Sequence, residues 1–337
     1  MSINFVSSRR IIFKLCIVVA AAAGSASVFA QAAQPVQSAA LPPGPIRLIV
    51  PFTPGTGIDL IARTVGPKLA ERLGRSVVVD NRAGASGNIG TEAVVRAAPN
   101  GSTLLVTVNT LVMNASLYPQ LAFDPVKDLT PVTLTSWGQL LLVANPKTGF
   151  KTAPELVAAA RQAPGRINYG SPGVGTPHHL AMELFKTTAG VFVTHIPYRG
   201  TGPALTDLLG GQIETMFLPI HVALPHVKSG RLVALGIGSD KRHPLMPEVP
   251  TLLEAKAGNV NVDMWYGIFA PPGTSPELVA LFNREIKDIL LSEEVEKAFQ
   301  AQGMDPSSST PGEFKSLVEL DAKRWAQLIK AQSITAN

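Results

Sequence analysis

Short apolar segments typical of buried strands alternate with amphipathic helical segments along the chain from Ile46 onward. This alternation constrains the fold strongly, because each helix must cross a face of a sheet before the next strand begins. We therefore predict an α/β fold with mainly parallel sheets that are covered by helices on both faces. The chain has 337 residues, which is too many for one ordinary core, so two lobes are expected.

The predicted strands are short and regularly spaced. They cover residues 46–52, 76–80, 103–108, 139–146, 167–171, 193–198, 213–219, 232–239 and 265–272. Helix starts are marked by three Thr-x-x-Glu sequences, at Thr152–Glu155, Thr274–Glu277 and Thr310–Glu313. Each is a capping box, in which the threonine and the glutamate bond each other's backbone N–H. The last two predict long amphipathic helices near 275–301 and 311–330.

Residues 1–30 have the pattern of an export signal. Arg9, Arg10 and Lys14 precede an apolar run over 15–28, and small residues before Gln31 suit signal cleavage. Both the general and the twin-arginine export routes stay open. Residues 31–44 predict a flexible tether. Cys16 is the only cysteine, so the exported chain would carry no thiol, and the predicted compartment is a bacterial periplasm.

Net charge gives no sign of a nucleic-acid partner. The formal charge is +5, but the three cations of the first 30 residues contribute much of it. The remaining chain holds 26 basic and 24 acidic residues. No basic stripe with interleaved aromatic residues is present, so we expect no nucleic-acid binding.

Two glycine-rich loops each follow a strand and lead into a helix. They are Pro51–Asp59 and Tyr169–His179. Free N–H groups and the helix dipole at such positions favour an anion. Hydroxyls of Thr53, Thr56, Ser171 and Thr176 add donors. The alternative is that the glycines only let each helix pack closely. Neither loop matches the usual mononucleotide or dinucleotide motifs, which disfavours nucleotide binding.

Six segments in order resemble one family of proteins. They are "IRLIVPFTPGTGID", "VVVDNRAGASGNIGTEAVVRAAPNG", "LYPQLAFDPVKDLTPVTL", "INYGSPGVGTPHHLAMELFK", "VTHIPYRGTGPALTDLLGGQIETMF" and "ALPHVKSGRLVALGIGSDKR". Over about residues 45–331 the chain resembles the Bug (TctC-like) family, the periplasmic solute receptors of tripartite tricarboxylate transporters. The resemblance implies a two-lobed type II periplasmic-binding-protein fold with the ligand between the lobes, and no enzyme activity.

The resemblance also implies a domain division and partners. Lobe one would hold residues 45–143 plus 268–337, and lobe two residues 144–267. The segments 139–146 and 265–272 would be the two crossings. The protein would act as a monomer without a cofactor, and would deliver its ligand to membrane permease subunits. The runner-up is a receptor of the same fold that signals to a histidine kinase.

The candidate binding residues combine both glycine loops with nearby polar positions. The resemblance implies that the loops clasp a ligand carboxylate. The candidate set is Thr53, Gly55, Thr56, Gly57, Asp59, Asn109, Thr110, Ser171, Gly173, Gly175, Thr176, Tyr198 and Leu218. For Asp59, capping of the first helix and orientation of a water or ligand donor are both open.

The chain departs from the family pattern at three places. Thr56 replaces a glycine of the first loop, and Ile58 replaces a polar residue. Leu218 and Pro219 stand where many members have Asp-Asn, and that Asp can meet a ligand ammonium group. We therefore expect an organic acid, either a dicarboxylate or an aromatic acid, rather than an amino acid.

Metal and enzyme interpretations have weaker support. His179 and Glu183 share a helix face, but no His-Glu-x-x-His motif is present. Gly-x-Ser-x-Gly is also absent, although Ser171 near several histidines leaves a hydrolase as a third hypothesis. Trp265 could line a cleft or pack the hinge.

Overall fold

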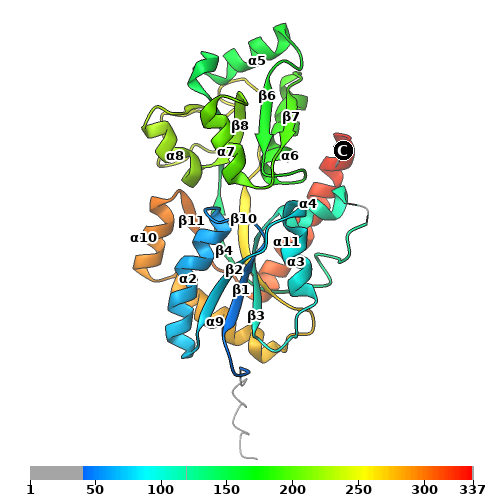
Figure 1. Ribbon diagram of the computed structural model, residues 1–337, viewed down its shortest axis with the longest axis vertical. Coiled ribbons are helices and arrows are strands. Elements are labelled where there is room, and N and C mark those ends of the chain that lie inside the picture. Colours follow the sequence, from blue (N-terminus) through cyan, green and yellow to red (C-terminus); the bar gives the residue numbers. More distant parts are fainter. Residues whose placement is uncertain (1–40, 119, 336–337) are drawn as a thin grey trace, which may run out of the picture. The chain divides into compact units, whose positions relative to one another are not determined.

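The computed structural model describes residues 41–118 and 120–335, and within them two mixed sheets (Figure 1). The predicted export signal and most of the predicted tether lie outside the described residues. The first sheet is six-stranded, in the order β11-β4-β10-β3-β1-β2, and the second is five-stranded, in the order β7-β6-β8-β5-β9. We call the parts built on them the first and the second lobe.

The strands of the first lobe come from both ends of the described chain. They are β1 (Ile46–Val50), β2 (Val77–Asn81), β3 (Thr103–Val108), β4 (Thr130–Gly138), β10 (Met264–Ala270) and β11 (Met304–Pro306). Its helices are α2 (Gly57–Leu73), α3 (Asn88–Val95), α4 (Thr110–Leu117), α9 (Pro276–Leu290), α10 (Glu293–Ala301) and α11 (Pro311–Ala331), with the short 3-10 turn η1 (Ala85–Gly87). Helix α2 packs on β1, β2 and β3 and against α9, whereas α11 packs on α4 and β4.

The second lobe is formed by the middle of the chain, drawn in green in Figure 1. Its strands are β5 (Leu140–Ala144), β6 (Asn168–Ser171), β7 (Thr194–Pro197), β8 (Thr215–Pro219) and β9 (Val233–Ile237). Its helices are α5 (Ala153–Gln162), α6 (Pro177–Ala189), α7 (Thr201–Gly210) and α8 (Ile220–Lys228), with the 3-10 turn η2 (Pro146–Thr148).

The second sheet is buried on both faces, and strand alternation explains how. Leu140, Leu142 and Ala144 of β5 point into one apolar core, while Leu141 and Val143 point into another. Successive side chains on a strand face opposite sides. A continuous run of apolar residues is therefore what a strand covered on both faces needs.

The prediction of mainly parallel sheets was wrong. In the first sheet β1 pairs in parallel with β2 and β3, but β10 runs antiparallel to β3 and β4. In the second sheet β5 runs antiparallel to β8 and β9. Strand β11 also runs antiparallel to β4. The other two reversed strands, β5 and β10, lie next to the passages between the lobes. The chain enters the second lobe between Gly138 and Leu140 and leaves it between Ile237 and Met264, so β5 and β10 start in the reverse direction.

Two predictions about the C-terminal helices also need correction. The single helix predicted near 275–301 is two helices, α9 and α10, because Ser292 starts a new helix as its N-cap. At the predicted capping box of Thr274, the N-cap is instead Ser275, and the Thr274 hydroxyl donates to the Pro271 carbonyl oxygen. The box at Thr310 and Glu313 is complete.

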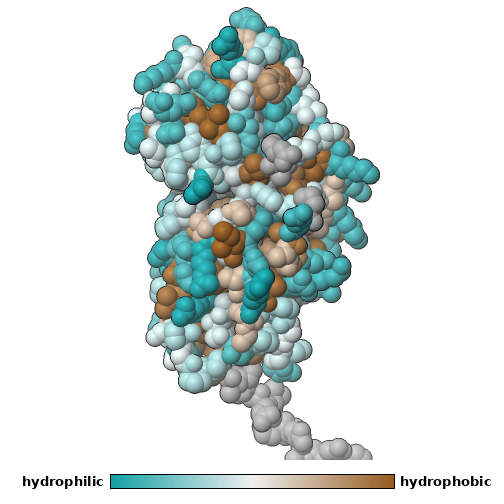
Figure 2. Space-filling model, turned by 45° about the vertical axis from the view of Figure 1, so that its right-hand side comes forward, coloured by the Kyte–Doolittle hydropathy of each residue, from teal (hydrophilic) through white to brown (hydrophobic). Residues whose placement is uncertain are grey.

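The surface has no single dominant apolar face in the view of Figure 2, where brown residues form separate patches among hydrophilic ones. Within the described part of the chain, no helix combines the length and the apolar character that crossing a membrane requires.

Candidate functional site: a cavity between the lobes

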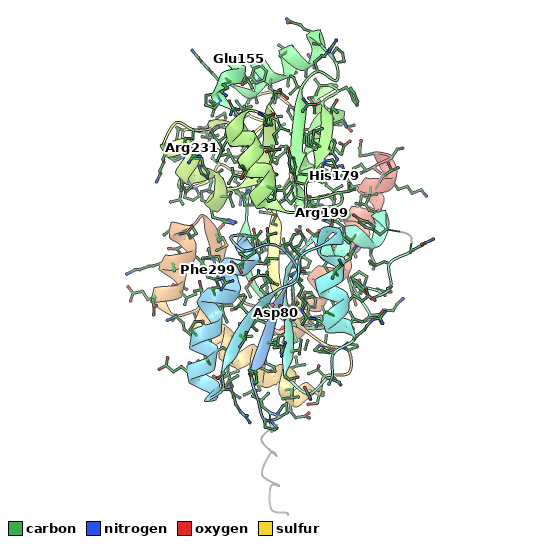
Figure 3. The ribbon with its side chains drawn as sticks, viewed as in Figure 1. Asp80, Glu155, His179, Arg199, Arg231 and Phe299 are labelled. Carbon is green, nitrogen blue, oxygen red and sulfur yellow. The ribbon has the colours of Figure 1, made fainter. Side chains whose placement is uncertain are left out.

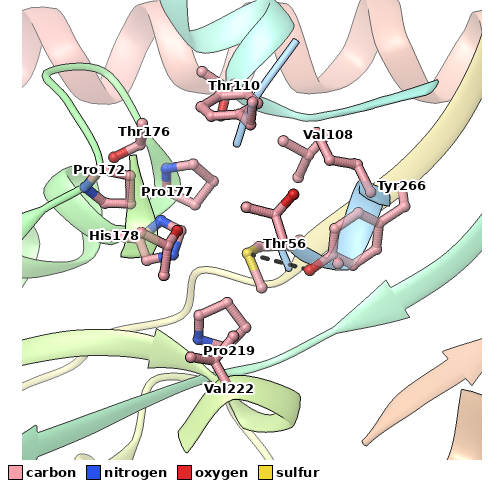
Figure 4. Close-up of a pocket in the computed structure, with 15 residues that line it drawn as sticks. Thr56, Val108, Thr110, Pro172, Thr176, Pro177, His178, Pro219, Val222 and Tyr266 are labelled. Atoms are coloured by element: carbon pink, nitrogen blue, oxygen red, sulfur yellow. Dashed lines mark hydrogen bonds between the residues drawn. The ribbon is translucent and has the colours of Figure 1, made fainter. Parts of the chain in front are cut away.

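A cavity of about 40 Å³ lies between the two lobes. This is room for a few water molecules, so a larger ligand requires the lobes to separate. Both glycine loops reach it, which confirms that they share one crevice (Figure 4). We call it the central cavity, and its lining residues are Phe52, Thr56, Gly57, Ile58, Val108, Thr110, Pro172, Thr176, Pro177, His178, Thr201, Pro219, Val222, Met264 and Tyr266.

The first turns of five helices contribute to this lining. Gly57 begins α2, Thr110 begins α4, Pro177 begins α6 and Thr201 begins α7, while Pro219 is the N-cap of α8. A helix N-terminus carries free N–H groups and roughly half a positive charge. Among the described residues, none with a charged side chain lines the central cavity. The local field therefore comes from the peptide backbone and favours an anion.

The loop of the first lobe is held from below by Asp59. The Gly55 N–H donates to Asp59 Oδ2 at 2.9 Å, and Arg63 Nε donates to the same oxygen at 3.0 Å. Asn81 Nδ2 donates to Asp59 Oδ1 at 3.0 Å. Burial raises the pKa of Asp59, but these three groups outweigh it, and the pKa lies below its ordinary value. Asp59 therefore shapes the loop through its hydrogen bonds and does not line the cavity.

The loop of the second lobe is held by three stacked rings. Ser171 Oγ lies 2.7 Å from His195 Nε2, and the His195 ring stacks against both Tyr169 and His179 at centroid distances of 4.7 and 4.4 Å. The Gly175 N–H donates to His179 Nδ1 at 3.3 Å. Burial lowers the pKa of His195 to about 3 and that of His179 to about 4, so both are neutral near pH 7.

The loops also touch the opposite lobe directly. Ser86 Oγ donates to the Val174 carbonyl oxygen at 2.6 Å, and Tyr118 OH donates to the same oxygen at 3.2 Å. A Cβ on Gly200 would lie 2.8 Å from Thr53 Oγ1, and Gly200 has a φ of +120°. Glycine is required there both by this approach and by its backbone conformation.

A second cavity adjoins the first and shares Phe52 and Pro172 with it. Its other lining residues are Thr53, Ala83, Gly84, Ala85, Ser86, Gly87, Ile89, Gly173, Tyr198, Arg199 and Gly200. We call it the side cavity. Figure 3 shows Arg199 on the side of the second lobe that faces the first, with Glu155 and Arg231 farther from it. The Tyr198 hydroxyl donates to Asp207 Oδ2 at 2.8 Å.

The structure distributes the thirteen candidate residues among cavity and core. Thr56, Gly57, Thr110 and Thr176 line the central cavity, and Thr53, Gly173 and Tyr198 line the side cavity. The other candidates line neither cavity, namely Gly55, Asp59, Asn109, Ser171, Gly175 and Leu218.

Several candidate side chains already have partners inside the protein. Asn109 Nδ2 donates to the Asp263 carbonyl oxygen, and the Ser171 side chain is fully buried. Leu218 is fully buried in one core of the second sheet, and its neighbour Pro219 lines the central cavity instead. The Thr176 hydroxyl is occupied as well, because it donates to the Gly173 carbonyl oxygen at 2.7 Å and caps α6.

Several cavity residues were not predicted from the sequence. In the central cavity the polar ones are His178, Thr201 and Tyr266. Strand alternation gives the signal for Tyr266, because its neighbour Trp265 is fully buried on the other face and donates to Asp321 Oδ2 at 2.8 Å. Trp265 thus packs the core. Within the described ranges, no group of three or more His, Cys, Asp or Glu residues is placed to hold a metal ion.

Comparison with known proteins identifies the family of this chain. Residues 61–334 match the family described as "Tripartite tricarboxylate transporter family receptor". Protein BugT of Bordetella pertussis is 37% identical over 300 residues, which cover 88% of this chain and 92% of that protein.

Solved structures show the same fold. A protein of R. palustris solved with adipate has a TM-score of 0.84 and 31% identity, and the match covers 87% of this chain and 99% of that one. MatC from Rhodopseudomonas palustris, solved with bound malate, has a TM-score of 0.81 and 30% identity over 86% of this chain and all of that one. With two lobes around one cavity and relatives of this kind, the chain belongs to the TctC family of periplasmic solute receptors, which includes the Bug proteins.

Proposed function

We propose that this chain binds a small organic carboxylate in the central cavity and delivers it to the permease of a tripartite tricarboxylate transporter. The observation that carries the proposal is that the N-termini of five helices contribute to a cavity whose described lining residues carry no charged side chain. Backbone N–H groups from both lobes then bind one anion, and binding favours the state in which the lobes touch. The two lobes correspond to the two sheets, and an export signal in residues 1–30 would place the receptor in the periplasm.

The cavity lining favours an organic acid over an amino acid. An ammonium group needs a nearby carboxylate, and among the described lining residues none is acidic. The walls formed by Phe52, Val108, Pro177 and Pro219 suit a carbon skeleton. Organic acids that carry no ammonium group, aromatic acids among them, are therefore the expected ligands.

A thermal-shift screen of organic acids tests this proposal. A ligand present at 100 times its dissociation constant stabilises the folded state by about 2.7 kcal/mol. The screen should include aspartate, a plain dicarboxylate and an aromatic carboxylate. Strongest stabilisation by aspartate would reject the preference for an organic acid.

A pair of glycine variants locates the binding site. A Cβ at Gly57 would lie 2.9 Å from both His221 Cε1 and Tyr266 OH, whereas a Cβ at Gly202 has no neighbour within 4 Å. Gly57→Ala should abolish the ligand-induced shift, and Gly202→Ala should keep it. Delivery to the permease is then tested by uptake of the labelled acid in cells that lack either the receptor or the permease.

We also propose that the protein has no catalytic function. Ser171 is fully buried, and its hydroxyl is bonded to His195 and to the Gly173 backbone. A nucleophile must reach its substrate. Ester turnover that disappears in Ser171→Ala would contradict this part of the proposal.

A further inference from the structure

His178 has unused hydrogen-bonding groups in the central cavity. It is the second residue of α6, and Figure 4 shows it among the side chains that line the cavity. Its side chain is buried, with only 8% of the residue exposed. Within the described part of the chain, neither of its ring nitrogens has a hydrogen-bond partner. A buried polar group without a partner costs about 1–3 kcal/mol, so a bound ligand that supplies one gains affinity.

The protonation state of His178 limits what it can bind. Burial, with a smaller contribution from the neighbouring His221, lowers its pKa to about 3. The imidazole is therefore neutral near pH 7, with one N–H donor and one nitrogen that only accepts. The accepting nitrogen needs a donor from the ligand, which a carboxylate cannot provide.

The groups near His178 are also neutral. Burial lowers the pKa of His221 to about 4, and among the described residues its Nε2 has no partner. Burial raises the pKa of Tyr266, whose hydroxyl makes only a 3.8 Å contact with the Met264 sulfur. His221 and Tyr266 lie on opposite lobes, and both come within 2.9 Å of the point where a Gly57 Cβ would stand. Tyr266 lines the central cavity, whereas His221 is not among its lining residues and lies next to Gly57.

The neutral side chains near His178 limit which second functional group the ligand can carry besides its carboxylate. A second carboxylate would enter a low-dielectric site whose described lining offers no cationic side chain. An ammonium group would find no carboxylate there. A hydroxyl can donate to the accepting nitrogen of His178 and accept from the Tyr266 hydroxyl, and both residues line the cavity.

We propose that His178, together with Tyr266, binds a hydroxyl group of the ligand, and that the receptor selects hydroxylated monocarboxylates over dicarboxylates. The inference rests on the proposed carboxylate receptor and names its ligand class. The helix N-termini bind the carboxylate, and His178 recognises the hydroxyl on the rest of the molecule.

Isothermal titration calorimetry with two matched ligand series tests the inference. On a benzene ring the probes are para-hydroxybenzoate, para-methylbenzoate and terephthalate. On a straight chain they are omega-hydroxyhexanoate, heptanoate and pimelate. In each series one position carries a hydroxyl, a methyl or a second carboxylate. In the series that fits, the hydroxy acid should bind about tenfold more tightly than the methyl analogue and more tightly than the dicarboxylate.

Variants identify the residue responsible. In His178→Leu the preference for the hydroxy acid should disappear, while the methyl analogue keeps its affinity. His178→Gln retains a donor and an acceptor and should restore part of the preference. His226→Leu is the control, since His226 lies on α8 of the same lobe but lines neither cavity.

The outcomes separate the inference from the proposed function. If the methyl acid or the dicarboxylate binds best to the wild-type protein, the inference is overturned and the carboxylate receptor stands. The inference is also overturned, and the carboxylate receptor again stands, if the preference for the hydroxy acid survives in His178→Leu. If no probe of either series binds, the proposed function itself is contradicted.

Discussion

The hydroxyl of Ser86 in the first lobe donates a 2.6 Å hydrogen bond to the carbonyl oxygen of Val174 in the second lobe. Ser86 itself lines the side cavity. Val174 lies in the second glycine loop, which reaches the central cavity. The bond exists only while the lobes touch. It therefore contributes to the free-energy difference between the closed and open states rather than to the stability of either lobe.

Removal of this bond should weaken ligand binding without loosening the fold. Ser86→Ala is expected to lower affinity for the best carboxylate of the screen about fivefold, the equivalent of about 1 kcal/mol. Titration calorimetry measures the change. Ser229→Ala is the control, since Ser229 Oγ bonds only the His226 carbonyl oxygen at an exposed position. Equal affinities of wild type and Ser86→Ala would contradict the role of the bond in closure.

The neighbouring residues Trp265 and Tyr266 should separate stability from binding. Trp265→Phe removes the donor to the buried Asp321 carboxylate and should lower the free energy of unfolding by about 2 kcal/mol. Tyr266→Phe removes a hydroxyl that faces the cavity, so ligand affinity should fall while the free energy of unfolding stays nearly constant. Denaturant unfolding and calorimetry on both variants check this. The prediction fails if ligand affinity and the free energy of unfolding change in the same way in both variants.

Replacement of Asp59 should destabilise the first lobe in a pH-dependent way. Asp59→Asn is expected to lose about 1–2 kcal/mol at pH 7, because the carboxylate holds Gly55 and Arg63. The pKa of Asp59 in the folded protein lies below its ordinary value of 3.8. Its stabilisation is therefore complete above that value and is lost as the pH falls through the folded pKa. The difference in unfolding free energy between the two proteins should shrink as the pH falls below 3.8 and through the folded pKa; a difference that does not shrink there would refute the assignment.

Protonation of the buried histidines should destabilise the protein in mild acid. The pKa of His178 is about 3 in the folded protein against an ordinary value of 6.5, so the unfolded chain binds a proton first as the pH falls. Stability due to this neutral histidine is complete above pH 6.5 and decreases below it, by up to about 1.4 kcal/mol per pH unit. His178→Leu should reduce the slope of unfolding free energy against pH between 6 and 4.5. Identical slopes for the two proteins would show that His178 is not buried as a neutral group.

Strand positions were predictable where burial and apolar character coincide. The predicted strand over residues 103–108 is β3 itself. In contrast, β4 was missed, because Thr133, Thr135 and Ser136 are fully buried polar residues that interrupt the apolar pattern. Their places in the core depend on partners distant in sequence, such as the Ser309 side chain that bonds the Leu134 N–H. Such long-range pairing is not visible in local periodicity.

The glycine loops were predictable as helix N-termini, but the orientation of their side chains was not. Thr176 and Ser171 looked equivalent in the sequence, yet Thr176 borders the cavity and Ser171 bonds His195 in the interior. His178 and His179 are adjacent on α6 and serve different surroundings, since His178 lines the cavity and His179 stacks on His195. A helix turn of about 100° per residue predicts that they diverge. Only the packing of the two lobes determines which one meets the ligand space.

Peptide groups cannot be replaced by point mutation, and five helix starts supply the positive potential of the central cavity. Side chains such as Val222, Pro219 and His178 can change without loss of that potential. A scaffold of this kind can diversify toward new carbon frameworks through substitutions in its walls, while every descendant inherits the same preference for negative charge.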